Sequence, residues 1–177
     1  IADVVFNHML VVASCSEWRR AQADEVKLQT LQQRLQKAVA PGGLDVDDFQ
    51  WPWFPMEGPS WDNEDRFEGW GCGEWSELKH CPQVIEVHQR HLRDLLNAGV
   101  RGFRFDAVKH MRPGHVAEYC KFLRNQHQNV YIYGEVLSVD AHMHEEYTTP
   151  LQMPTTDFRL TVFLRRVLAE GPAAAKA

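Results

Sequence analysis

The chain has 177 residues, with 19 Lys and Arg against 24 Asp and Glu, which gives a formal charge of −5. This acidic balance argues against a nucleic-acid partner, because phosphate neutralisation requires clustered Lys and Arg. Hydrophobic residues make up 44% of the chain and charged residues 24%, a globular composition. No apolar run approaches the roughly 20 residues of a membrane span, so we expect no membrane partner. No targeting signal is visible, and the compartment stays open between secreted, periplasmic and cytoplasmic.

The N-terminal part of the chain changes from a strand pattern to a helix pattern. Residues 1–6 are apolar except for Asp3, which favours a buried parallel strand. From residue 16 to 39 the apolar residues follow helical spacing, with Ser16 as N-cap and residues 41–43 as a Pro-Gly-Gly stop.

Residues 44–82 carry five tryptophans and four prolines and show no sustained period. We interpret them as an irregular excursion, since a long irregular segment rich in aromatic residues is more often functional than disordered. The tryptophans could stack on sugar rings or fill a small core, and the sequence leaves both readings open.

Regular alternation resumes after residue 82. Apolar spacing predicts, in chain order, helix 84–99, strand 100–107, helix 113–126 and strand 129–136. A polar loop then follows residue 136, and after it come strand 156–158 and helix 160–169. Strands that alternate with helices are typical of a parallel α/β fold.

The cysteines and several histidines receive structural interpretations. The four cysteines form no CxxC pair, which argues against a zinc site or a redox dithiol, while Cys72 and Cys81 could pair or stay free. His142 and His144 are interpreted as part of a solvated loop rather than a metal cluster.

Polar residues follow three of the predicted strands, at the strand ends where parallel α/β folds carry function. Asn7 and His8 follow the first strand. Arg104 and Asp106 lie two apart on one face of the next strand and can pair, either as a structural ion pair or as part of a site. Glu135 ends the strand after that.

Glu135 lies about one strand-helix-strand unit beyond Asp106, so the two carboxylates would end neighbouring parallel strands. Neighbouring strands lie about 4.8 Å apart, close to the roughly 5 Å carboxylate separation of retaining glycosidases. Inverting enzymes need a wider gap for a water molecule, so the spacing predicts retention.

The residues that carry this pattern resemble the α-amylase family, glycoside hydrolase family 13. DVVFNH at 3–8, GFRFDAVKH at 102–110 and GEVL at 134–137 resemble its first three signatures. DDF at 47–49 resembles part of the inserted domain, and TTDFRL at 155–160 the sixth strand. The resemblance implies that residues 1–177 form about strands 3 to 6 of a TIM (β/α)8 barrel, with an insertion over approximately 11–82.

By the same resemblance Asp106 is the nucleophile, Arg104 orients it, and Glu135 is the general acid and base. The residues that resemble sugar-binding positions are His8, Lys109 and His110. A structural calcium would involve Asn7 and His110; the family's usual Asp-Leu in the inserted domain reads Glu77-Leu78 here.

The resemblance implies a hydrolase that cleaves α-1,4 bonds in starch-like α-glucans or maltooligosaccharides. The alternatives are a transglycosylase or isomerase of the same family and a non-catalytic carbohydrate-binding homologue. The fourth signature, with a third carboxylate, does not occur before Ala177, and the chain opens on Ile1 inside a strand. We therefore expect part of a longer enzyme that is inactive and aggregation-prone in isolation, because an open sheet leaves unpaired edges.

Overall fold

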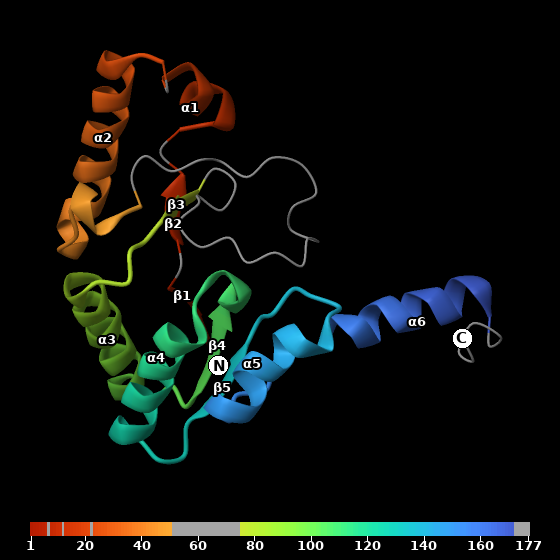
Figure 1. The fold of residues 1–177 in the computed structure, drawn as a ribbon. Helices are drawn as coiled ribbons and strands as arrows, with labels where there is room; N and C mark the ends of the chain where they lie inside the picture. The colour runs from red at the N-terminus through yellow and green to blue at the C-terminus, as the bar shows by residue number, and fades with distance from the viewer. Residues whose placement is uncertain (7, 12, 22, 51–74, 172–177) are drawn as a thin grey trace.

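A computed structural model describes residues 1–6, 8–11, 13–21, 23–50 and 75–171. Figure 1 shows the elements, which in chain order are β1 (Ala2–Val5), β2 (His8–Val11), α1 (Cys15–Ala21), α2 (Glu25–Val39), β3 (Trp75–Glu77), α3 (Pro82–Asn97), β4 (Gly102–Asp106), α4 (Pro113–Gln126), β5 (Tyr131–Gly134), α5 (Ala141–Leu151) and α6 (Phe158–Glu170). One-turn 3-10 helices lie at Ala40–Gly42, Val46–Asp48 and Val108–His110.

The central sheet has the strand order β1-β4-β5, and both strand pairs are parallel. Asp3 lies opposite Arg104, and Arg104 lies opposite Tyr133, so these residues form one row across the sheet. The three predicted strands of the parallel fold are therefore confirmed, each with ends shortened by one or more residues. All three strands point the same way, so their carboxyl ends lie at one edge.

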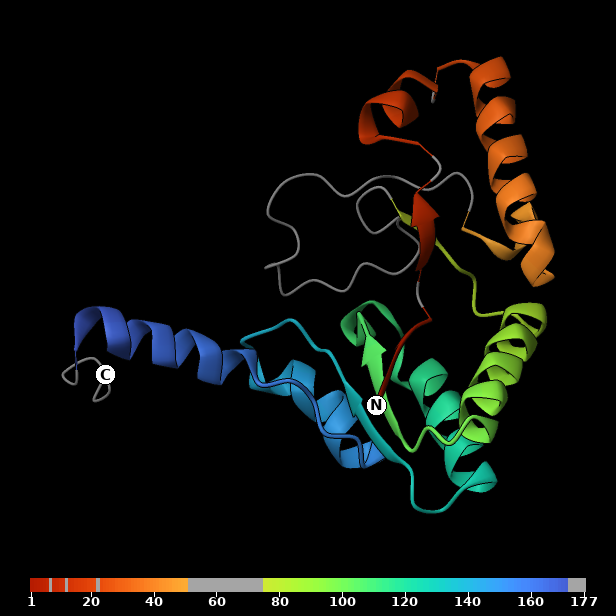
Figure 2. The same ribbon diagram turned by 180° about the vertical axis from the view of Figure 1, so that it is seen from behind.

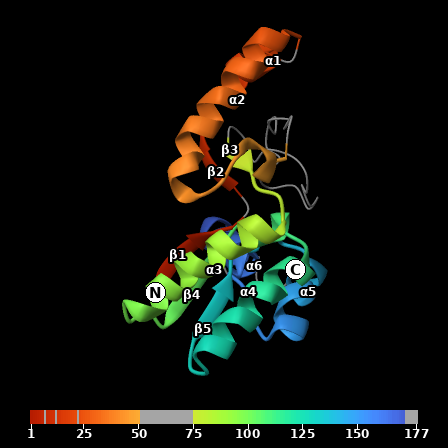
Figure 3. The same cartoon turned by 90° about the vertical axis from the view of Figure 1, so that its left-hand side faces the viewer.

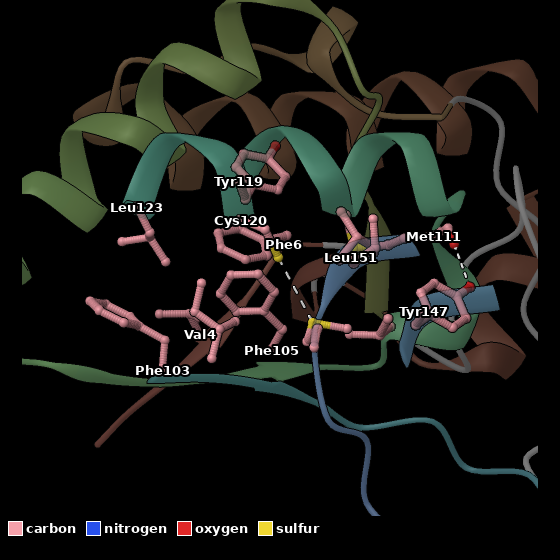
Figure 4. Packing of buried hydrophobic residues seen from close by; sticks show 14 of the residues in the cluster. Val4, Phe6, Phe103, Phe105, Met111, Tyr119, Cys120, Leu123, Tyr147 and Leu151 are labelled. Carbon is pink, nitrogen blue, oxygen red and sulfur yellow. Dashed lines mark hydrogen bonds between the residues drawn. The ribbon is translucent and has the colours of Figure 1, made fainter. Parts of the chain in front are cut away.

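Helices α3, α4 and α5 pack in sequence and cover one face of this sheet (Figures 1 and 3). Helix α4 has the predicted bounds and buries the predicted side, Val116, Tyr119, Cys120 and Leu123. Figure 4 shows Phe103 and Phe105 of β4 pointing from the sheet toward this helix. Phe6 stacks on Tyr119 with ring centroids 4.2 Å apart, which joins the end of the first strand segment to the same core.

Residues 16–39 form two helices, which corrects the prediction of one. The break lies before α2, where the Asp24 side chain accepts from the Lys27 backbone N–H as N-cap. Ser16 lies inside α1; the capping contacts come from Ser14 and Glu17, each of whose side chains accepts from the other's backbone N–H. The predicted stop is confirmed, since α2 ends at Val39 and Gly43 adopts φ 82°.

Parts of the excursion pair with, and pack against, the residues that precede it, which the sequence did not reveal. Strand β2 pairs antiparallel with β3, and Phe49 forms an isolated bridge with Leu78. Leu31, Leu35 and Phe49 belong to a second buried cluster, separate from the core of the main sheet. In Figures 1 and 2 the β2–β3 pair lies beyond the arrowhead of β4, on the side where the strands end, and Figure 3 shows α1 and α2 farther from α4 and α5.

Four of the five tryptophans of the excursion lie outside the described residues, as does Cys72. Cys81 is a free thiol in this structure, with Sγ 3.5 Å from Asp48 Oδ1.

The C-terminal third differs from the prediction in two places. The expected polar loop contains α5, which is N-capped by Asp140 and held to the core by the Tyr147 hydroxyl donating to the Met111 carbonyl (Figure 4). The expected strand at 156–158 is reduced to a single parallel bridge between Gly134 and Thr155, because Asp157 caps α6 immediately afterwards.

Helix α6 projects from the rest of the chain in Figures 1 and 2 and buries none of its residues. Its exposed apolar side chains are Leu160, Val162, Phe163, Leu164 and Leu168. Among the described residues no helix is both long and apolar enough to span a membrane.

Candidate active site

Two carboxylates lie side by side at the carboxyl edge of the sheet. Asp106 is the last residue of β4, and Glu135 directly follows β5. The Glu135 backbone N–H donates to the Phe105 carbonyl at 2.8 Å, and the Val108 N–H donates to the Glu135 carbonyl at 2.9 Å. These bonds extend the β4–β5 pairing through Glu135, which places its side chain next to that of Asp106.

Arg104 joins both carboxylates. Its Nη1 donates to Asp106 Oδ1 at 2.8 Å, and its Nη2 lies 3.0 Å from Glu135 Oε1. The predicted Arg104–Asp106 pair is therefore present, and the guanidinium also reaches the second carboxylate. Arginine suits this position because its planar fork can serve several oxygens at once.

Sequence reasoning missed a third carboxylate on the same arginine. Asp3 Oδ1 accepts from Arg104 Nη1 at 2.6 Å, which follows from their adjacent places in the β1–β4 register. The signal was present as the one charged residue in the first apolar run. Burial works against the charge of Arg104, but the bonds to Asp3 and Asp106 and the charge of Glu135 outweigh it and raise the pKa of Arg104.

The surroundings of Glu135 favour its protonated form more than water does. Burial raises the pKa of Glu135, a hydrogen bond with Asp106 raises it further, and the charge of Arg104 opposes both. Its Oε2 lies 3.4 Å from the backbone N–H of Ala107. Ala107 adopts a left-handed φ of 52°, an unfavoured conformation for alanine that turns the chain directly after Asp106.

A pocket of about 310 Å³ opens at these carboxylates. Its lining consists of His8, Asp106, Ala107, Lys109, His110, Glu135 and Leu137. The fold thus brings together every predicted site residue except Arg104, which contacts Asp106 and Glu135, and Asn7, which lies outside the described residues.

The two pocket histidines are held in a neutral state at pH 7. Burial lowers the pKa of His8, and the charge of Asp106 works in the opposite direction. Burial, with the charges of Lys109 and His8, lowers the pKa of His110 to about 4. Neutral imidazoles can each donate one hydrogen bond and accept another, as sugar hydroxyls require.

Lys109 and His144 are both buried. Lys109 is 1% exposed, and its Nζ donates to the Leu137 carbonyl at 2.7 Å. His144 lies on α5 and is buried, so the interpretation as a solvated loop residue is wrong for it; the ring of His142 is exposed.

Calcium stays a prediction. Asn7 lies outside the described residues, and within the described ranges no three His, Cys, Asp or Glu side chains are grouped to hold a metal ion. A His110 contribution alone does not make a calcium site, because calcium takes six to eight oxygen ligands.

Comparison with known proteins gives one relative by sequence and several by fold. No family model matches the chain. An α-amylase of Aeromonas hydrophila is 26% identical over 196 residues, covering 96% of this chain and 40% of that protein. The chain thus spans about two fifths of the length of this relative.

Solved structures share the fold at low sequence identity. An Anoxybacillus α-amylase matches 95% of this chain and 31% of its own, with a TM-score of 0.62 and 19% identity. An α-amylase of Malbranchea cinnamomea matches 93% and 31%, with a TM-score of 0.58 and 20% identity. A cyclomaltodextrin glucanotransferase matches 70% and 26%, with a TM-score of 0.61 and 18% identity.

The fold neighbours share the parallel α/β arrangement, and the Aeromonas relative is similar in sequence over 96% of this chain. The chain has the fold of part of a (β/α)8 barrel, as in these α-amylases, and it is similar in sequence to an α-amylase.

Proposed function

We propose that the protein is a retaining glycosidase that cleaves α-1,4 bonds in starch-like α-glucans or maltooligosaccharides. The observation that carries the proposal is Arg104, which binds two carboxylates at the ends of adjacent parallel strands beside a pocket. Asp106 is the nucleophile, and Glu135 is the general acid and base. We also propose that residues 1–177 form a partial barrel and that approximately residues 11–82 are a segment inserted within it.

In the first step Asp106 attacks the anomeric carbon while the bond from that carbon to the glycosidic oxygen breaks. Glu135 gives its proton to the leaving oxygen, which its raised pKa favours. The product is a β-linked glycosyl ester on Asp106 and a shortened glucan. In the second step ionised Glu135 takes a proton from water, whose oxygen attacks the same carbon and releases Asp106.

The other residues hold charge and substrate. Arg104 orients Asp106 by donating a hydrogen bond to it. His8 and His110 line the pocket as neutral imidazoles and bind sugar hydroxyls, and Lys109 lies in the same lining.

The stereochemistry of the first product tests the proposal. The protein expressed from its complete open reading frame is incubated with maltoheptaose, and the new anomeric proton is followed by NMR before mutarotation. Initial release of the α-anomer is expected, and initial release of the β-anomer would show inversion and exclude Asp106 as nucleophile.

The same samples separate the alternatives. Longer oligosaccharides or cyclic products instead of new reducing ends would indicate a transglycosylase. Saturable maltoheptaose binding without turnover would indicate a carbohydrate-binding homologue and overturn the catalytic roles.

A further inference from the structure

The backbone that follows Glu135 is held by two buried basic side chains. The carbonyls of Leu137 and Ser138, consecutive in the chain, each accept from one of them. Lys109 Nζ reaches the Leu137 oxygen at 2.7 Å, and His144 Nε2 reaches the Ser138 oxygen at 2.9 Å. The side chains come from opposite sides: Lys109 from the turn after β4 and His144 from α5.

Burial of these groups argues that the bonds matter. Lys109 is 1% exposed and His144 is 4% exposed. A lysine is almost never fully buried unless its ammonium is paired, because the charge loses its hydration. A charge-assisted bond to a carbonyl is roughly twice as strong as a neutral one. The chain thus keeps a buried cation where it binds the backbone two residues after Glu135.

His144 links two segments that flank Glu135. The Ser138 carbonyl can only accept, so Nε2 of His144 carries a proton, and in the neutral ring Nδ1 accepts from the Thr155 hydroxyl at 2.8 Å. Thr155 pairs with Gly134, the residue before Glu135. His144 therefore ties the segment beside Gly134 to the loop after Glu135.

The Glu135 carboxylate depends on this backbone for its position. Apart from Asp106, its described contacts are Arg104 at 3.0 Å and the Ala107 N–H at 3.4 Å, the latter long for a strong hydrogen bond. A shift of the loop would move the carboxyl group relative to a bound glucan. An error of about 1 Å in such a group costs roughly 100-fold in rate.

We propose that Lys109 and His144 are positioning residues that hold residues 136–138 and so keep Glu135 within reach of the leaving oxygen. The inference rests on the proposed function. It gives Lys109 a role in placing the acid, beside its place in the pocket lining. It also predicts that disturbing His144, which does not line the pocket, impairs proton transfer selectively.

Two substrates separate proton transfer from the rest of catalysis. Maltoheptaose needs Glu135 in both steps. The reaction of α-maltosyl fluoride with azide needs Glu135 in neither step. Fluoride leaves without a proton, and azide attacks the Asp106 ester without a base. The products are maltosyl azide and fluoride ion.

The test variants are His144→Leu and His144→Gln, made in the protein from the complete open reading frame. His142→Leu is the matched control, because His142 lies on the same helix with an 80% exposed side chain. We expect His144→Leu to lower kcat on maltoheptaose by about 10- to 100-fold with KM little changed. The rate with maltosyl fluoride and azide should change less than about twofold, and His144→Gln, which keeps a donor near the Ser138 carbonyl, should recover part of the loss.

Equal losses on both substrates, or no loss on either, would overturn the positioning role. Should His144→Leu not fold, Thr155→Val removes only the Nδ1 partner and should show the same substrate selectivity at smaller size. Amide hydrogen exchange over 135–140 should rise in the active variants, and unchanged exchange there would also contradict the inference. Absence of turnover in the wild-type protein would instead contradict the proposed function.

Discussion

Side chains of the β1-β4-β5 sheet point alternately to its two faces, and the two faces differ in burial and in charge. The face under the helices carries Val4, Phe103, Phe105 and Ile132, all nearly or fully buried. The opposite face carries Asp3, Arg104 and Asp106, whose charges are paired and partly exposed. Because successive side chains of a strand point to opposite faces, alternate residues of β4 belong to the core and to the charged cluster.

Within the five residues of β4, the side chains that stabilise the fold and those that form the candidate site point to opposite faces. Burying apolar side chains supplies the main favourable free energy of folding, whereas exposed or half-exposed ion pairs supply little. The charged face therefore has little stabilising role, and its presence points to chemistry. Substitutions on the two faces should have opposite consequences.

The largest effect is expected at Asp106. Asp106→Asn should lower kcat on maltoheptaose by about 10⁴-fold or more, because the amide cannot form the glycosyl ester. The melting temperature should change little, since Arg104 keeps Asp3 and Glu135 as partners. Asp94→Asn, at an exposed position on α3, is the control and should behave as wild type in both assays. Retained turnover in Asp106→Asn would remove the catalytic role of this face.

The opposite result is expected for a core residue under the helices. Leu123 is fully buried on α4, and Leu123→Ala should lower the free energy of unfolding by about 2 to 5 kcal/mol through lost burial and a cavity. Urea unfolding measures this loss, while kcat per folded molecule should stay near wild type. Leu168→Ala on α6, where the side chain is 85% exposed, should cost less than about 0.5 kcal/mol. A large cost at Leu168 would mean that α6 is covered in solution.

A smaller effect should appear in the pH dependence of stability. Burial, with the charges of His91 and His80, lowers the pKa of His88 from 6.5 to about 4. Between these values the unfolded chain binds a proton that the folded chain does not, so acidification favours unfolding by up to about 1.4 kcal/mol per pH unit. His88→Asn should flatten the fall in unfolding free energy from pH 6.5 to 4, and the exposed His142→Asn on α5 should leave it unchanged. An unaltered slope in His88→Asn would show that His88 is not protonated differently in the two states.

The sequence predicted the parts of the fold that depend on local periodicity. Helix α4 has its predicted bounds because its apolar spacing and Pro113 at the first turn agree. The Arg104–Asp106 pair followed from a spacing of two on a strand. The prediction of α5 failed because its composition is polar, and its buried residues, His144, Tyr147 and Leu151, are mixed in type.

Long-range pairing accounts for the other differences. The β2–β3 pair joins segments more than 60 residues apart, and nothing local in residues 8–11 marks them as a strand. Asp3 reaches Arg104 through the β1–β4 register, a relation between distant residues. The bond from Lys109 to the Leu137 carbonyl likewise depends on how two turns meet after the strands have paired.

The β1–β4 register also sets the order in which the chain can fold. Ala2 pairs with Phe103, so β1 has its β4 partner about 100 residues later in the chain. At synthesis rates of about 5 to 20 residues per second, β4 emerges roughly 5 to 20 s after β1. Local folding is much faster than this, so α2 and the β2–β3 pair have time to form before β1 meets β4. Strand β4 is therefore made well after β1, the strand with which it pairs. The contact between Asp3 and Arg104 can form only after β4 has been made and has paired with β1.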